Sequence, residues 1–70
     1  MAKAQRTIAS FVGAKGEVRA HGVDDLIRQL PQSSGLSRRS VLDGVRELRN
    51  SGRVRVRTRD GVTTLTNRSL

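Results

Sequence analysis

The spacing of the apolar residues changes once along this chain and divides it into two kinds of structure. Up to Gly52, apolar side chains recur every three or four residues, the repeat of an α-helix with one buried face. From Arg53 onward they alternate with arginine, the repeat of a half-buried β-strand. With only 70 residues, both kinds must share one small core. The sequence therefore predicts a single α+β domain over residues 1–70, with helices first and strands last.

Three helices are predicted from the helical repeat, over about residues 2–12, 23–30 and 38–50. Each carries one apolar stripe at spacings of three and four residues. The stripes are Ala4, Ile8, Phe11 and Val12 in the first helix, Val23, Leu26, Ile27 and Leu30 in the second, and Val41, Val45 and Leu48 in the third. Three stripes of this kind predict three helices packed around a common core.

The ends of these helices carry recognisable signals. Gly13 and Gly16 are both natural ends for the first helix, and Pro31 ends the second because proline cannot continue the hydrogen-bond ladder. Ser37 is a good N-cap for the third helix, and Gly52 follows its last turn. The residues between Pro31 and Ser37 are expected to form a turn.

A two-stranded hairpin is predicted over residues 53–67. Asp60-Gly61 is a preferred type I′ turn, and with these two residues as the loop the register follows. It pairs Val54 with Asn67, Val56 with Leu65 and Thr58 with Thr63 on one face, and Arg55 with Thr66, Arg57 with Thr64 and Arg59 with Val62 on the other. One face suits packing, and the other is a strip of arginine and threonine. A further short strand is possible near residues 17–20, around Val18.

The composition excludes several classes of site. The chain has no cysteine and a single histidine, His21, so neither a thiol nucleophile nor a zinc site is expected. Its acidic residues form no recognisable acid/base pair, and no phosphate-binding loop precedes a helix. No run of apolar residues exceeds two, which predicts no membrane span. We expect no catalytic residue, metal, cofactor or small-molecule effector, and therefore no enzyme.

The charge points to an anionic partner. Lysine and arginine number 14 against 6 acidic residues, a formal net charge of +8, and 12 of the 14 basic residues are arginine. Arginine presents a planar fork of donors that suits phosphate groups and guanine edges. Most of the excess positive charge follows Leu36, so we expect the second half of the chain to contact the partner.

The order of predicted elements and the stretch GLSRRSVLDGVRELRNSGRVRV resemble the winged helix-turn-helix family of DNA-binding domains. Leu36 stands at the hydrophobic position of the turn, Ser37 at the cap, and Gly52 leads into the hairpin, which is the wing of that family. The resemblance implies that the third helix enters the major groove as a recognition helix and that the wing contacts phosphates or the minor groove. The link from Pro31 to Leu36 is longer than the usual turn of the family.

The candidate recognition-helix residues lie on its polar face and in its first turn. Arg39, Asp43, Arg46 and Asn50 point opposite the apolar stripe. Arginine and asparagine can contact guanine and adenine through paired hydrogen bonds. The alternative is a solvated face with ion pairs from Asp43 to Arg39 and Arg46.

Two arginines begin the third helix, where the helix dipole disfavours cations. Arg38 and Arg39 in that position predict an external anion, although screening by solvent is an alternative. Ser37 and Ser40 can also donate to phosphate, with capping as the simpler role for Ser37.

The candidate wing residues form one row. Like charges at alternate positions of a strand repel one another, so a bound polyanion is the simplest reason for the row. Protection of an edge strand against aggregation is the alternative. The wing candidates are Arg53, Arg55, Arg57, Arg59 and Thr64.

These observations predict a protein that binds double-stranded DNA, specifically a small transcriptional regulator. A sequence-neutral architectural protein of the nucleoid and a winged-helix module for protein–protein contact remain alternatives. The expected location is cytoplasmic and nucleoid-associated, and two copies can be envisaged as a homodimer on DNA. RNA is less favoured, because a single aromatic residue, Phe11, leaves no stacking platform for unpaired bases.

Overall fold

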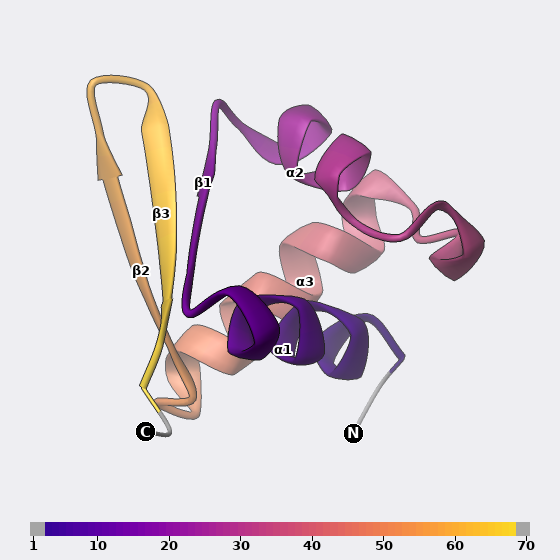
Figure 1. Cartoon of the computed structure of the whole chain (residues 1–70), viewed down its shortest axis with the longest axis horizontal. Helices are drawn as coiled ribbons and strands as arrows, with labels where there is room; N and C mark the ends of the chain where they lie inside the picture. Colours follow the sequence, from indigo (N-terminus) through magenta and orange to yellow (C-terminus); the bar gives the residue numbers. More distant parts are fainter. Residues whose placement is uncertain (1–2, 69–70) are drawn as a thin grey trace.

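The computed structural model describes residues 3–68 and confirms the α+β fold class. Three helices precede a C-terminal antiparallel hairpin, in a winged-helix-like layout (Figure 1). In chain order the elements are α1 (Lys3–Lys15), β1 (Glu17–Ala20), α2 (Val23–Gln29), the short 3₁₀-helix η1 (Gln32–Ser34), α3 (Arg38–Asn50), β2 (Val54–Arg59) and β3 (Val62–Asn67).

The helix boundaries differ from the predicted ones at α1 and α2. Helix α1 continues to Lys15 rather than stopping at Val12, and Gly16, with φ 79°, donates its N–H to the Val12 carbonyl at 2.7 Å. Of the two candidate stops, Gly16 is therefore the one used. The predicted first residue, Ala2, lies outside the described residues. Helix α2 ends at Gln29, one residue earlier than predicted, because Leu30 before Pro31 is already extended.

The hairpin register is the predicted one at every pair. Val54 lies opposite Asn67 at one end and Arg59 opposite Val62 at the other. Asp60 and Gly61 both have positive φ, 53° and 77°, as a type I′ turn requires. The hairpin is thus specified locally, by its turn residues and its alternation.

Strand β1 confirms the short strand expected near residues 17–20 and completes a three-stranded sheet. It pairs antiparallel with β3, so that the order is β1-β3-β2 and β2 is an edge strand. Val18 lies opposite Leu65, which in turn lies opposite Val56, and these three side chains share the face turned toward the helices. The core lies between that face and the three helices; its members are Ile8, Val12, Val18, Ala20, Leu26, Leu30, Val41, Leu48, Val54 and Leu65.

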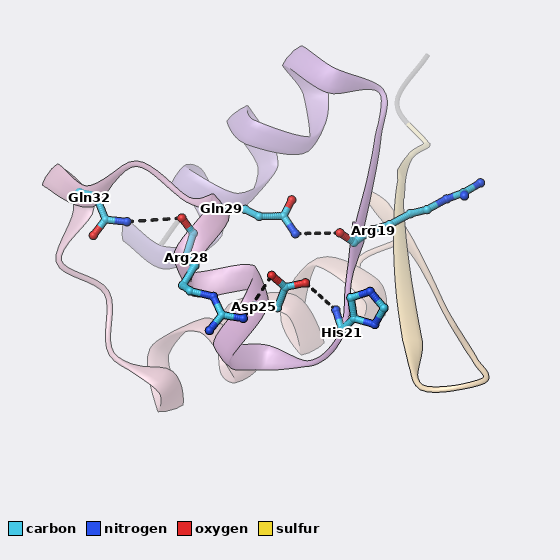
Figure 2. Close-up of polar contacts among 6 residues, drawn as sticks. All are labelled: Arg19, His21, Asp25, Arg28, Gln29 and Gln32. Atoms are coloured by element: carbon cyan, nitrogen blue, oxygen red, sulfur yellow. Dashed lines mark hydrogen bonds and ion pairs between the residues drawn. The ribbon is translucent and has the colours of Figure 1, made fainter.

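Two hydrogen bonds connect α2 to β1 and to His21, which follows β1 (Figure 2). The Gln29 side chain donates from Nε2 to the main-chain carbonyl of Arg19 on β1, at 2.7 Å. The Asp25 carboxylate accepts from the His21 backbone N–H at 2.8 Å and lies 3.5 Å from the Arg28 guanidinium. The contact therefore uses the main chain of His21, and its imidazole side chain is exposed.

Asp25 should make the stability of the domain sensitive to acid. The hydrogen bond from the His21 N–H, with help from Arg28, lowers the pKa of the Asp25 carboxyl below its ordinary value of 3.8. The carboxylate therefore stabilises the fold fully above its ordinary pKa, and this contribution is lost as the pH falls from there through the lower pKa of the folded state. We expect the free energy of unfolding, measured with urea between pH 6 and pH 3, to fall more steeply for the wild type than for Asp25→Asn. Asp24→Asn removes the same charge from the same turn and should keep the wild-type pH dependence; equal slopes for Asp25→Asn and the wild type would contradict this role.

Ser37 caps α3, as expected from the sequence. Its Oγ accepts from the Ser40 backbone N–H at 3.2 Å and donates to the Ser40 Oγ at 3.0 Å. Ser37→Ala is expected to lower the free energy of unfolding by about 1 kcal/mol in urea denaturation, because it leaves a helix donor without its acceptor. Ser37→Asp, which retains a capping oxygen, should restore most of the loss. Equal losses for both variants would mean that the cap contributes nothing.

No helix among residues 3–68 is long and apolar enough to cross a membrane. In the same part of the chain, no three acidic, histidine or cysteine side chains come together in a way that could hold a metal ion.

Candidate nucleic-acid interface

Helix α3 separates a buried face from a polar one, as its stripe predicts. Val41, Gly44 and Leu48 are buried against the rest of the domain. The predicted site residues on the opposite side are all exposed: Arg39, Asp43, Arg46 and Asn50. The structure therefore brings these four together on one accessible face.

The arginines of α3 are not neutralised within the domain. Over residues 3–68 there are three ion pairs, which join Arg19 to Glu17, Arg28 to Asp25 and Arg59 to Asp60. Neither of the alternative pairs, from Asp43 to Arg39 or to Arg46, is formed. The guanidinium groups of α3 are consequently free to meet an external anion.

The polar face of α3 has a mixed side and a basic side. Toward α1, Asp43 lines a shallow groove together with Lys3, Ser40 and Glu47. Toward β2, Arg46 and Arg49 line a second groove with Leu42, Val45 and Val56. Asp43 thus lies on the side of the polar face toward α1 and does not line the groove beside the wing.

Arg49 was not predicted as a site residue, although it lines the groove beside the wing. On a helical wheel it falls close to the buried stripe and so looks like a boundary position. The groove on that side of α3 exists because Val56 of β2 lies beside the helix. An arginine next to the stripe, one turn before the wing, is the signal that could have identified it.

The first turn of α3 holds Ser37, Arg38, Arg39 and Ser40. Both arginines are exposed, and the turn contains no acidic residue. The helix dipole therefore adds to their positive potential instead of being offset by a carboxylate. Because the Ser37 hydroxyl is used in capping, Ser40 is the hydroxyl that remains able to donate outward.

The wing presents its predicted arginine row on the sheet face that points away from the helices. The side chains of the row are exposed, and Thr64, half-buried, lies opposite Arg57 on the same face. The one ion pair within the wing, from Arg59 to Asp60, has a separation of 4.0 Å with both side chains 93% exposed, so it neutralises little charge. The exposed row consists of Arg53, Arg55, Arg57 and Arg59.

Arg19 extends this basic face and was also missed. It lies opposite Thr64 on β3, whose other neighbour is Arg57 on β2, so both arginines share the outer face. In Figure 2 the Arg19 side chain points away from α2 while its carbonyl meets Gln29. No local pattern could have placed it, because the partner of β1 lies more than forty residues along the chain.

The two basic surfaces meet along β2. One is the polar side of α3, and the other is the outer face of the sheet, whose edge strand β2 carries the arginine row. Val56 of β2 faces the groove that Arg46 and Arg49 line, while Arg55 and Arg57 beside it face outward. A polyanion lying along this edge can contact arginines of both elements.

Comparison with known proteins found no relative of this chain. No protein-family model, curated protein or solved structure matches the chain. The resemblance to winged helix-turn-helix domains therefore depends on residues 35–56 and on the observed order of helices and strands.

Proposed function

We propose that this protein binds double-stranded DNA without catalysing a reaction, with α3 in the major groove and the wing on the backbone. The observation that carries the proposal is the free arginine surface where α3 meets β2. Arg46 and Arg49 line the groove, and Arg55 and Arg57, next to Val56 along β2, point outward from the other face of the strand. None of the four is ion-paired within residues 3–68. An α-helix fits the major groove of B-DNA, where arginine can contact the N7 and O6 atoms of guanine.

A role in transcriptional regulation is the more specific form of the proposal. It is supported by Arg39, Arg46 and Asn50, whose side-chain types can distinguish base pairs. The resemblance to winged helix-turn-helix regulators supports it too, and would allow two copies to bind as a homodimer on a palindromic site. The protein would then be associated with the nucleoid.

Direct binding measurements test the proposal. By fluorescence anisotropy at increasing salt, the affinity for a labelled 20-base-pair duplex should fall with a log–log slope of about −3.6, the value for four neutralised phosphates. An acidic protein of similar net charge serves as the competing ligand. Absence of duplex binding at low salt, together with binding to the acidic protein, would reject DNA as the partner and favour a protein-contact module.

A sequence-neutral architectural role is the second candidate. It is favoured by the wing, where the arginine row can contact phosphates but its position on a sheet face offers no obvious route to base edges. Selection of bound molecules from a random duplex library separates the two candidates. A defined motif supports a regulator, and its symmetry reports whether two copies bind; an even distribution of sequences supports the architectural role.

A further inference from the structure

Leu42 is an apolar side chain in an unusual place. It is the one large hydrophobic residue in the described part of the chain that is exposed, with 49% of its surface accessible. It lies on α3, on the side away from Val41, Gly44 and Leu48. Part of the side chain borders an apolar hollow that Val23 and Leu26 of α2 also line, and the rest is open to solvent.

Cationic side chains precede and follow Leu42 along the helix. Around the axis of α3, all four of its arginines lie within about 60° of Leu42, spaced one turn before it, one turn after it and two turns after it. These are Arg38, Arg39, Arg46 and Arg49. Beside Leu42, Val45 and Val56 form an apolar floor to the groove shared with Arg46 and Arg49. The centre of the basic surface is thus apolar.

This arrangement limits what can cover Leu42. A hydrophobic protein partner seated in the groove over Leu42 would leave the Arg46 and Arg49 guanidinium groups buried and unpaired, which is strongly unfavourable. The matching surface must be anionic and carry a small apolar group at its centre. The major groove of DNA has this chemistry, because phosphates border it and the C5 methyl group of thymine is the apolar feature on its floor.

We propose that Leu42 contacts the C5 methyl group of a thymine and so contributes to the choice of binding site. This inference rests on the proposed function, and it specifies which base Leu42 contacts and which group of that base. Arg39 and Arg46 lie within about one helical turn of Leu42, a distance of roughly one or two base steps. The preferred site should therefore contain thymine within about two base pairs of guanine.

Replacement of thymine by deoxyuridine tests the contact, since it removes the methyl group and leaves every hydrogen-bonding atom of the base in place. Affinities would be measured for a selected duplex and for the same duplex with all thymines replaced. The wild type should bind the deoxyuridine duplex about fourfold more weakly, the loss expected when one buried methyl group is removed. Leu42→Ala should bind both duplexes equally. Val62→Ala, which shortens an apolar side chain on the wing without changing charge, is the matched control and should keep the fourfold difference.

Three outcomes would overturn the inference. They are equal affinity of the wild type for both duplexes, a fourfold difference retained by Leu42→Ala, and loss of that difference in Val62→Ala. In each of these cases duplex binding persists and the proposed function stands. Failure of the wild type to bind any duplex would instead reject the proposed function itself. Thermal melting of Leu42→Ala, expected to keep a cooperative transition above the assay temperature, shows that the variant is folded and that any change in binding arises at the interface.

Discussion

Gly44→Leu is expected to remove most of the stability of the domain. Gly44 is buried where α1 crosses α3, and a Cβ atom there would lie 3.0 Å from the Ile8 Cδ1, 3.2 Å from the Ala4 Cβ and 3.3 Å from the Ala4 carbonyl carbon. A leucine needs three further carbons at this close helix crossing, and overpacking of this kind costs about 3 kcal/mol. A domain of this size has a total stability of only about 3–5 kcal/mol. Urea denaturation followed by circular dichroism at 222 nm should show a large shift to lower urea or an unfolded protein.

The variants Gly13→Ala and Gly44→Ala are the controls for this prediction, because they compare an open helical glycine with the closely packed one. Gly13 on α1 is exposed, and a Cβ atom there meets only the Asn67 Nδ2 at 3.6 Å, an ordinary contact. Gly13→Ala should raise the free energy of unfolding by about 0.5–1 kcal/mol, since alanine favours the helix over glycine. Gly44→Ala should gain nothing, because the contact with the Ala4 main chain offsets that preference. A stable Gly44→Leu protein, or equal gains at both glycines, would mean that α1 and α3 do not approach as closely as the structure has them.

Two classes of arginine variant should change DNA binding in different ways. Arg39→Ala and Arg46→Ala should each reduce the preference for a selected duplex over a random one by about 5- to 150-fold, because each removes about 1–3 kcal/mol of base discrimination. Arg55→Ala and Arg57→Ala should weaken binding to both duplexes alike and reduce the magnitude of the salt slope by about 0.9 each. Anisotropy titrations on both duplexes at several salt concentrations measure all of these quantities.

Arg6→Ala is the matched control for these variants. It removes the same charge from an exposed position on α1, away from α3 and β2, and should alter neither the preference nor the salt slope. If the α3 and wing variants lose the same affinity on selected and random DNA, base recognition is wrong and the architectural role is favoured. If Arg6→Ala weakens binding as much as the others, the affinity depends on net charge and not on this surface.

The elements predicted correctly from the sequence are those held by local interactions. Helix α3 begins and ends at the predicted residues because Ser37 caps it and Gly52, with φ 78°, follows its last turn. The hairpin register follows from Asp60-Gly61, since a two-residue turn leaves only one way to pair the strands. The polar face of α3 follows from helical geometry alone, which is why its four predicted residues are all exposed.

The predictions that failed or fell short depend on contacts between distant residues. Helix α1 runs past Gly13 to Lys15, and the choice between two glycine stops is made where the Gly16 carbonyl accepts from the Asn67 N–H at 3.1 Å. The short helix η1 was expected only as a turn. Arg19 and Arg49 were missed because one joins the basic face across β3 and the other joins the groove through its proximity to β2.

The sequence by itself determined the presence of the three α-helices, the hairpin register and the unequal distribution of charge, because each follows from neighbours within a few residues along the chain. Only the tertiary structure decided how those charges combine. The pairing of β1 with β3 adds Arg19 to the arginine row, and the position of β2 beside α3 turns Leu42, Arg46 and Arg49 into one groove. The physical reason is that these placements arise from burial of one shared core, in which residues forty or more positions apart pack together and no local pattern records their pairing.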